Sequence, residues 1–584
     1  MLPTGQDFFQ AFYGALYAGA VPVPIYPPAR PAQIGEHLRR QAGMLRNACA
    51  VILIADDAAQ PLARLLGMQV PSLRNVRTVA ALAGADSGPL PKRTASDTAL
   101  IQYTSGSTGD PKGVVLSHAN LLANIRAMGA VIRPTASDVF VSWLPLYHYM
   151  GLIGAWLGSL HYGVPLIVMS PQRFLLRPER WLWAIHRYRG TLAAAPNFAF
   201  ELCLRKIDDE ALNGLDLGSL RMLANGAAPV SPMTIRRFTE HFAPYGFWPG
   251  AMAPVYGLAE NAVRLAFPPI GRPPIIDRVD RKALTDEGRA VPARSDAADV
   301  AEIVACGRPL PGHQIRIADA TGELDDRQEG RLQFRGPSAC SGYFNNPEQS
   351  RALFDKGWLN SGDLAYVAEG DVFITGRSKD IIIRAGQHVY PQEIEDAVGR
   401  LPGIRKGCVA AFGGADPRTG TERLVVVAET RETETDARAE LTATVGEAIA
   451  RLCDTPADKI LLVPSQTVPK TSSGKIRRTA ARQLFDRGAF GQSRPSVRMQ
   501  IIGLALSGAL SRLRRAKRAA LEIVYAGYWW AMVGLFGAFT WPLILALPTR
   551  AARWAVLHRL SRALLWMLGI RVSVQIARPP PAHP

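Results

Sequence analysis

The sequence predicts an α/β fold in three parts: a large N-terminal part, a small α+β part and a membrane-associated helical tail. Between about residues 97 and 330, apolar strand-like runs alternate with helical patterns, which favours helices layered on mostly parallel strands. The strand-like runs include 99–103, 164–169 and 221–224, and the helical patterns include 178–187 and 233–241. Past residue 376, a strand (424–428), a helix (438–452) and a strand (460–463) predict the compact α+β unit.

The chain opens on a predicted helix, Asp7–Ala18, and a predicted short buried strand, Val21–Tyr26. No Lys or Arg precedes the first apolar stretch, so this segment does not resemble a signal peptide. A chain that starts directly on a core element suggests a large domain that is N-terminally incomplete. The polar, proline-containing stretch 271–300 is interpreted as an insertion or a long loop.

The charge of the chain is concentrated in its tail. The 584 residues carry 67 Lys and Arg against 49 Asp and Glu, a net charge of +18, and most of the excess lies after residue 494. Because these basic residues flank an apolar run instead of forming a basic face on a folded domain, they favour anionic lipid over nucleic acid as a partner.

The apolar run, 523–549, contains no charged residue. A helix of this length, at about 1.5 Å per residue, reaches roughly 40 Å and can cross a hydrocarbon core of about 30 Å. We therefore predict a membrane helix, or a re-entrant hairpin if Pro542 interrupts it. A buried core helix is the alternative.

Residues 103–118, YTSGSTGDPKGVVLSH, predict a phosphate-binding loop between two strands. Its small residues let backbone N–H groups approach phosphate oxygens, and hydroxyl groups and a lysine supply further donors. No GK[ST] sequence and no helix follow the loop, so it is not a P-loop. A mobile Gly/Ser linker is the alternative. The candidate residues are Thr104, Ser105, Gly106, Ser107, Thr108, Gly109 and Lys112.

This loop resembles the signature of the adenylate-forming superfamily, which includes acyl-CoA synthetases and fatty acyl-AMP ligases. Further motifs follow in the family's order: NGAAP at 225–229, YGLAE at 256–260, SGD at 361–363, GRSKD at 376–380 and PKTSSGK at 469–475. The resemblance covers about residues 1–490. It implies that ATP activates a fatty acid to an acyl adenylate with release of pyrophosphate.

The resemblance also implies roles for individual residues. Lys475, Glu260 and His148 are the expected catalytic residues: Lys475 would neutralise charge at the α-phosphate, Glu260 would bind Mg²⁺, and His148 would line the carboxylate site. Lys379 is the expected hinge for rotation of the small domain. Besides the phosphate loop and Lys112, the expected ATP-binding residues are Gly226, Ala227, Tyr256, Gly257, Asp363 and Arg377.

The same resemblance divides the chain into five segments. They are a large adenylation domain (1–378), a small lid domain (379–490), a basic linker (491–522), a membrane helix or hairpin (523–549) and an amphipathic stub (550–584). The tail resembles the N-terminal membrane motif of glycerolipid acyltransferases, although their HxxxxD motif does not follow. The expected location is the cytoplasmic face of a membrane.

The acyl acceptor is open at this point. Segments such as VYPQEIE resemble the fatty acyl-AMP ligase branch, which passes the acyl group to the phosphopantetheine thiol of an acyl-carrier protein. Tyr149 and Ala228 depart from that branch, and GAAP is common in relatives that use CoA. A long-chain acyl-CoA synthetase is therefore the alternative, and an inactive membrane-tethered acyl-binding module is the alternative of another class.

Overall fold

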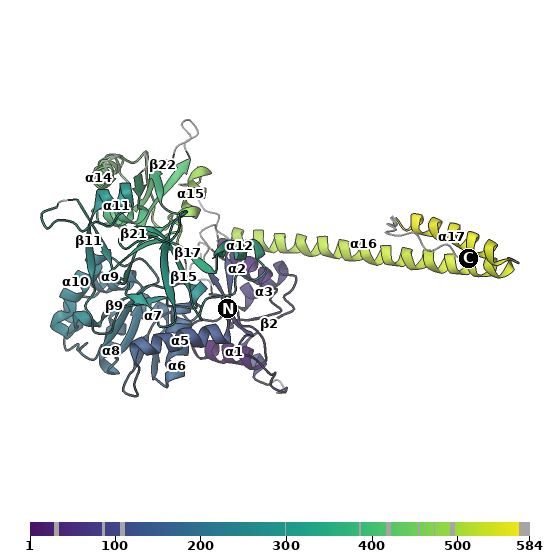
Figure 1. The fold of residues 1–584 in the computed structure, drawn as a ribbon, viewed down its shortest axis with the longest axis horizontal. Helices are drawn as coiled ribbons and strands as arrows, with labels where there is room; N and C mark the ends of the chain where they lie inside the picture. The colour runs from purple at the N-terminus through teal and green to yellow at the C-terminus, as the bar shows by residue number, and fades with distance from the viewer. Residues whose placement is uncertain are drawn as a thin grey trace. The chain divides into compact units, whose positions relative to one another are not determined.

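The computed structural model divides the chain into two compact units, Met1–Ile501 and Ile502–Pro584 (Figure 1). The described residues are 1–27, 34–84, 88–104, 111–297, 299–384, 387–415, 422–453, 456–471, 474–490 and 497–570. The first unit contains the large and the small domain, and the second contains most of the helical tail.

A five-stranded parallel sheet with the order β6-β5-β7-β8-β9 forms the centre of the large domain. Because β6 and β7 lie on opposite sides of β5, the chain reverses its direction of winding there. In such sheets, ligands bind in the crevice at the carboxyl ends of the strands near this reversal. The strands are β5 (Phe140–Ser142), β6 (Leu166–Val168), β7 (Leu192–Ala195), β8 (Met222–Asn225) and β9 (Met252–Pro254).

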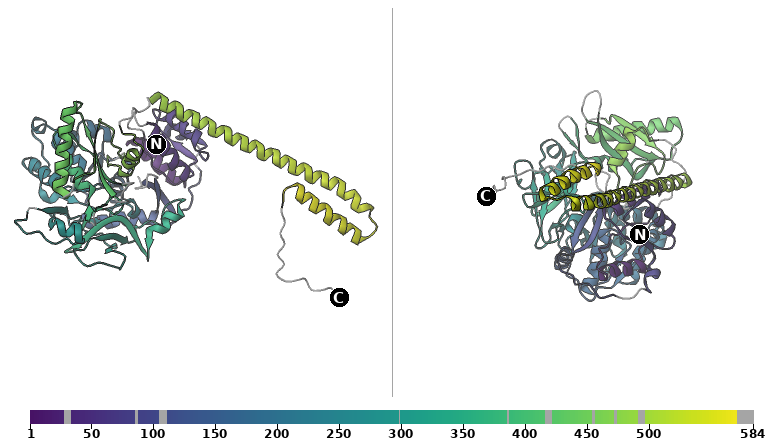
Figure 2. Two further views of the ribbon diagram at one scale, coloured as in Figure 1. Left: turned by 90° about the horizontal axis from the view of Figure 1, so that it is seen from above. Right: turned by 90° about the vertical axis from the view of Figure 1, so that its right-hand side faces the viewer.

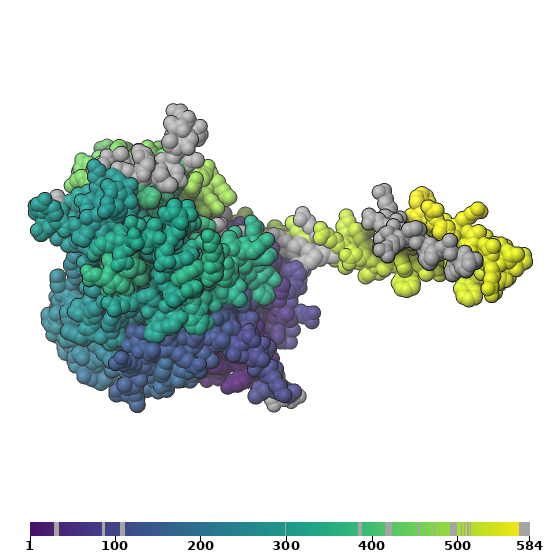
Figure 3. All heavy atoms as spheres, in the orientation of Figure 1, coloured from purple at the N-terminus to yellow at the C-terminus, as the bar shows by residue number. Residues whose placement is uncertain are grey.

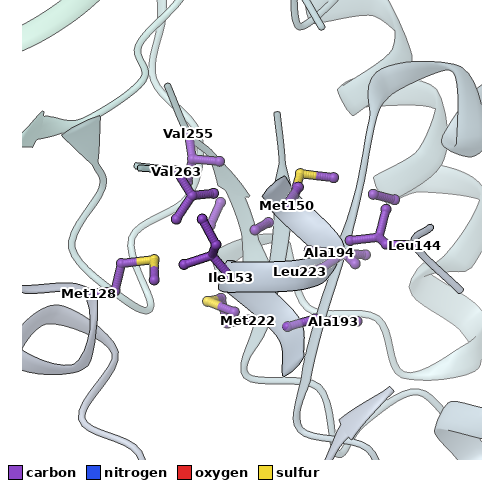
Figure 4. Close-up of a cluster of buried hydrophobic side chains, with 14 of the residues drawn as sticks. Met128, Leu144, Met150, Ile153, Ala193, Ala194, Met222, Leu223, Val255 and Val263 are labelled. Atoms are coloured by element: carbon purple, nitrogen blue, oxygen red, sulfur yellow. The ribbon is translucent and has the colours of Figure 1, made fainter. Parts of the chain in front are cut away.

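Helices connect these strands and bury the core. The connecting helices are the π-helix η2 (Met150–Leu157), α6 (Gly158–Tyr162), α7 (Pro171–Leu176), α8 (Glu179–Arg187), α9 (Asn197–Lys206) and α10 (Pro232–Phe242). Part of the core is shown in Figure 4, where Met150 and Ile153 of η2 meet Ala193 and Ala194 of β7 and Met222 and Leu223 of β8.

Antiparallel strands and further helices complete the large domain. β3 (Thr98–Thr104) pairs with β4 (Lys112–Ser117), as predicted for the two strands that flank the phosphate loop. Another sheet has the order β14-β15-β17-β16, with β18 also on β17: β14 (Gln314–Ala318), β15 (Gly330–Arg335), β16 (Phe354–Asp355), β17 (Trp358–Ala368) and β18 (Asp371–Arg377). The helices are α1 (Gln6–Tyr17), α2 (Ile34–Asn47), α3 (Gln60–Gln69), α4 (Val79–Leu82), α5 (His118–Ile132), α11 (Arg281–Glu287) and α12 (Pro347–Leu353). Short pairs are β1 (Ile52–Ile54) with β2 (Asn75–Arg77), β10 (Ala266–Phe267) with β13 (Arg308–Pro309), and β11 (Ile276–Asp280) with β12 (Val300–Val304).

The small domain has the predicted α+β character, with its own apolar core. Its elements are β19 (Ile382–Arg384), β20 (Gln387–Val389), α13 (Pro391–Val398), β21 (Ile404–Ala415), β22 (Glu422–Thr430), α14 (Thr435–Cys453), β23 (Lys459–Val463) and α15 (Arg478–Asp486). Ion pairs hold it against the large domain: Arg281 to Glu393 and Lys406 to Glu201, both at 2.5 Å.

The tail folds as a helical hairpin of α16 (Val497–Ala546) and α17 (Arg550–Met567) (Figures 2 and 3). The hydroxyl groups of Tyr525 and Tyr528 donate to the carbonyl oxygens of Leu568 and Met567, at 3.2 and 3.1 Å. Pro542 lies inside α16 without ending it. The hairpin therefore turns after Ala546, and not at Pro542 as the sequence suggested.

Two sequence-based expectations are wrong. Val21–Tyr26 is not a strand. Pro22 and Pro24 lack the N–H groups that a ladder needs, although the Pro22 carbonyl accepts from the Ile101 amide. Residues 271–300 are not a long loop, because they contain β11 and α11. Val279, Leu284 and Ala290 bury that segment in a core of its own with Tyr366.

Candidate active site

The carboxyl ends of three parallel strands carry predicted site residues. His148 follows β5, Gly226 and Ala227 follow β8, and Tyr256 and Gly257 follow β9. β8 pairs directly with β9, so the last two segments are neighbours at one edge of the sheet. The strand order thus brings these motifs to the crevice where open α/β sheets bind ligands.

Two of these positions need glycine because other groups lie too close for a side chain. A Cβ on Gly226 would lie 2.7 Å from the Val255 side chain and 2.8 Å from the Arg264 guanidinium. A Cβ on Gly257 would lie 1.9 Å from the Val263 carbonyl oxygen. The backbone itself therefore forms the wall of the crevice here.

Asp363 of β17 is the centre of a hydrogen-bonded group in the large domain, close to the point where the small domain begins. The Tyr256 hydroxyl donates to its Oδ2 at 2.5 Å, and Arg377 Nε donates to its Oδ1 at 3.1 Å. Asp363 is buried, with 6% of the residue exposed. The carboxylate raises the pKa of Arg377, and burial followed by the same carboxylate raises the pKa of Tyr256 well above its usual value. Two donors therefore fix the position of Asp363.

Glu260 and Lys112 lie on either side of Tyr343. The Tyr343 hydroxyl donates to Glu260 Oε1 at 2.9 Å, and the Lys112 ammonium lies 4.8 Å from the centre of the Tyr343 ring. Lys112 also donates to Gln349 at 2.8 Å. Thr104 pairs with Lys112 across the β3–β4 ladder, so both lie at the base of the predicted phosphate loop. Ser105, Gly106, Ser107, Thr108 and Gly109 lie outside the described residues.

His148 is held in a single orientation at the start of η2. Its Nδ1 accepts a hydrogen bond from the Met150 amide at 3.3 Å. Burial, with smaller effects from Lys475 and Arg264, lowers the pKa of His148 to about 3. The ring is therefore neutral at physiological pH and carries its proton on Nε2, where it can donate a hydrogen bond.

Lys475 comes from the small domain and lies close enough to Arg377 and Asp363 for their charges to act on it. Burial, and then Arg377, lower the pKa of Lys475 to about 8. Lys379 is exposed in the turn after β18, and its charge contributes to a lowered pKa of Lys112 after burial. The structure thus brings Lys475, Asp363, Arg377 and His148 together.

The residues at Glu260 fit a magnesium ion that is shared with phosphates. The described residues contain no cluster of three or more His, Cys, Asp or Glu side chains suited to a metal. However, Mg²⁺ commonly uses one or two carboxylates together with substrate phosphates. Glu260 Oε1 is oriented by Tyr343, and Lys112 lies beside the same ring. A metal bound here would neutralise phosphate charge.

Sequence reasoning missed three residues of this site: Tyr343, Gln349 and Arg264. Tyr343 and Gln349 reach the site only because residues 342–344 lie along β4, where the Phe344 amide donates to the Gly113 carbonyl at 2.7 Å. No local motif marks such a contact. The sequence did contain a signal that could have identified Arg264, because it is the one charged residue in the apolar run AVRLAF.

The fold and this site define an enzyme that handles an anionic nucleotide. Residues 1–344 match the family model of the AMP-binding enzymes, and residues 393–475 match the C-terminal domain of AMP-binding enzymes. The chain therefore belongs to the AMP-binding, or adenylate-forming, enzyme family, and it is an AMP-forming ligase. The predicted large and small domains of this fold are confirmed.

Curated relatives and a solved structure lie within this family. The long-chain-fatty-acid–AMP ligase FadD26 of Mycobacterium marinum is 33% identical over 527 residues, which cover 84% of this chain and 87% of the relative. The medium-chain-fatty-acid–[acyl-carrier-protein] ligase JamA of Moorena producens is 33% identical over 511 residues, covering 84% and 86%. A structure from a study of fatty acyl-adenylate ligases from E. coli and L. pneumophila has a TM-score of 0.79 and 33% identity, and covers 83% of this chain and 88% of that chain.

The pKa of Lys475 predicts an alkaline limit to adenylation. Because kcat/KM reports the free enzyme, it should fall as the pH rises through about 8, where the buried ammonium loses its charge. Lys475→Arg keeps its charge at all accessible pH values. This variant should therefore be slower but lose the alkaline limb, as measured by pyrophosphate release from pH 6 to 10. An alkaline limb shared by both enzymes would contradict the assignment.

Glu260→Gln should raise the Mg²⁺ concentration needed for half-maximal adenylation by at least about tenfold. The amide can still accept from Tyr343, so the substitution removes mainly the charge. Titration of Mg²⁺ at fixed ATP measures the effect. Glu348→Gln, an exposed acid on α12, is the control and should leave the titration unchanged. An unchanged titration for Glu260→Gln would exclude Glu260 as a ligand.

Proposed function

We propose that the protein activates a fatty acid as its acyl adenylate and then passes the acyl group to the phosphopantetheine thiol of an acyl-carrier protein. The main support is the position of Lys475 from the small domain beside Asp363 and Arg377 of the large domain. FadD26 and JamA, a fatty-acid–AMP ligase and a fatty-acid–carrier-protein ligase by name, support the substrate and the acceptor.

The proposed reaction needs two anions, a carboxylate and ATP, to meet in one crevice. Asp363 would accept hydrogen bonds from the ribose hydroxyls, with Tyr256 beside the adenine. Thr104 and Lys112 would hold the phosphates from the base of the loop, and Glu260 would bind the magnesium ion. Each role uses the charge or hydrogen-bonding capacity that the side chain has in the structure.

Lys475 and His148 would act on the carboxylate end of the acid. The neutral His148 ring can donate from Nε2 without competing for the negative charge. The Lys475 ammonium would stabilise the charge that develops as the carboxylate attacks the α-phosphorus. Lys379 is exposed in the turn between β18 of the large domain and β19 of the small domain. It is the proposed hinge about which the small domain turns for the thioester step.

CoA is the alternative acceptor. Ala228 and Tyr149 depart from the carrier-protein branch, and both positions lie at the crevice, next to Ala227 and His148. Rates of thioester formation with CoA and with a phosphopantetheinylated carrier protein would decide between them. An inactive acyl-binding module would show no ATP–pyrophosphate exchange with any fatty acid.

Lys475→Ala should reduce acyl-adenylate formation by about 10²–10³ and leave thioester formation from supplied acyl adenylate largely intact. The reason is that Lys475 contacts the site only when the small domain is closed as it is here. Lys459→Ala, which removes an exposed lysine of the same domain, is the control for both steps. Equal losses in both half-reactions for Lys475→Ala would contradict the proposed role.

We also propose that the tail binds the cytoplasmic face of an anionic membrane. Ala516–Ala546 is long and apolar enough to cross a membrane by length and composition, and Trp530 and Trp541 are both 70% exposed. α17 packs alongside this apolar segment and exposes Arg559 and Arg562 to solvent. This pairing of an apolar helix with a basic one suits a hairpin that lies in the membrane interface.

A chain that ends at Ile501 should stay in the supernatant with anionic phospholipid vesicles, whereas the full chain should sediment with them even in high salt. Salt weakens contacts made by charge alone, but it does not weaken burial of apolar surface. Both chains should show the same adenylation rate with soluble substrates. A full chain that stays soluble with vesicles would mean that α16 does not bind lipid.

A further inference from the structure

Arg264 is a buried cation that no described residue neutralises. It is 4% exposed, and its guanidinium forms no hydrogen bond or ion pair with any residue that the structure describes. The groups that act on it electrostatically are the Tyr149 phenol and the Cys306 thiol. Burial raises the pKa of each to about 12, so both are neutral. Burial lowers the pKa of Arg264 to about 10, so Arg264 remains charged.

The backbone places this side chain firmly. One side-chain amide, that of Asn124, accepts from the Arg264 N–H at 3.2 Å and donates to the Arg264 carbonyl at 2.8 Å. The same amide donates to Ser338 at 2.9 Å. The position of Arg264 is therefore set by hydrogen bonds to its backbone and does not depend on a partner for its guanidinium. A buried charge that pairs with no described residue is costly, which suggests that a partner arrives with the substrate.

The guanidinium lies next to Gly226 and near His148. Its Nη1 is 2.8 Å from the point where a Cβ on Gly226 would be, and Gly226 follows β8. Its charge and that of Lys475 both act on His148, the residue proposed to line the carboxylate site. Arg264 thus lies beside Gly226 and close enough to His148 to act on it, and on a different element from Asp363 and Lys112.

We propose that Arg264 determines acyl specificity by binding a second oxygen-bearing group on the acid, separate from the carboxylate that is activated. This inference rests on the proposed adenylating function and narrows its substrate class to oxygenated acids, with a second carboxylate satisfying the guanidinium best. The activated carboxylate fits the role less well. It loses its charge on adenylation and would leave Arg264 unpaired again, whereas a second group keeps its oxygen through both half-reactions.

The test compares monocarboxylic acids with two oxygenated series of matched chain length, α,ω-dicarboxylic acids and 3-hydroxy acids. Pyrophosphate release gives kcat and KM for each acid with the parent enzyme, Arg264→Met and Arg264→Lys. The parent enzyme should prefer at least one oxygenated series by tenfold or more in kcat/KM. Arg264→Met should abolish this preference, mainly by raising KM for the oxygenated acid. Arg264→Lys should keep part of it, because it keeps the charge but not the planar fork.

Thermal unfolding supplies an independent readout. Because Arg264→Met replaces an unpaired buried charge by an apolar side chain of similar length, the melting temperature without substrate should stay the same or rise. A clear fall would show that Arg264 has a structural role and would overturn the proposal.

Two kinetic outcomes would also overturn it. One is a parent enzyme that prefers plain monocarboxylic acids. The other is a loss in Arg264→Met that is equal for every acid, which would assign Arg264 to the activated carboxylate. Either outcome leaves the adenylating function intact, since that function fails only if no acid releases pyrophosphate.

Discussion

The carboxylate of Asp363 is the contact on which the arrangement of the site depends. It accepts from Tyr256, which follows the central sheet, and from Arg377, which ends β18 just before the small domain. Its charge also acts on Lys475 of the small domain. One buried carboxylate therefore joins the nucleotide edge of the sheet to the element from which the small domain starts. Without it, Lys475 would lose the carboxylate that offsets the charge of Arg377.

The site as a whole is short of negative charge. The cations among the site residues are Lys112, Arg377, Lys379, Lys475 and Arg264, and the acids that act on them are Glu260, Asp363 and Asp380. Repulsion among these cations raises the electrostatic free energy of the site without ligands. The same cations lower the free energy needed to bring a polyphosphate and a carboxylate together. Burial is the main cause of the lowered pKa values of Lys112 and Lys475, and a neighbouring cation, Lys379 or Arg377 respectively, adds to it.

Sequence patterns predicted the elements whose signal is local. The helix at 7–18, the helix at 438–452 and the strand at 424–428 follow from periodicity, and they are α1, α14 and β22 in the structure. The pattern failed in two places. The apolar run 21–26 contains two prolines, which lack the N–H groups that a strand ladder needs. Residues 271–300 are ordered by packing on Tyr366, a residue that is distant in the sequence. Motifs located Asp363 and Lys475, but Tyr343 and Gln349 depend on the pairing of distant segments, which no spacing along the chain reveals.

The two hydrogen bonds from Asn124 to the backbone of residue 264 bear on how such enzymes can change their specificity. The amide fixes the main chain on both sides of this position through N–H and C=O groups that every residue other than proline possesses. The side chain at 264 can therefore be exchanged while the main chain keeps its course. On the proposal that Arg264 binds the acid, a single substitution at this position changes which acids the enzyme accepts and leaves the main chain in place.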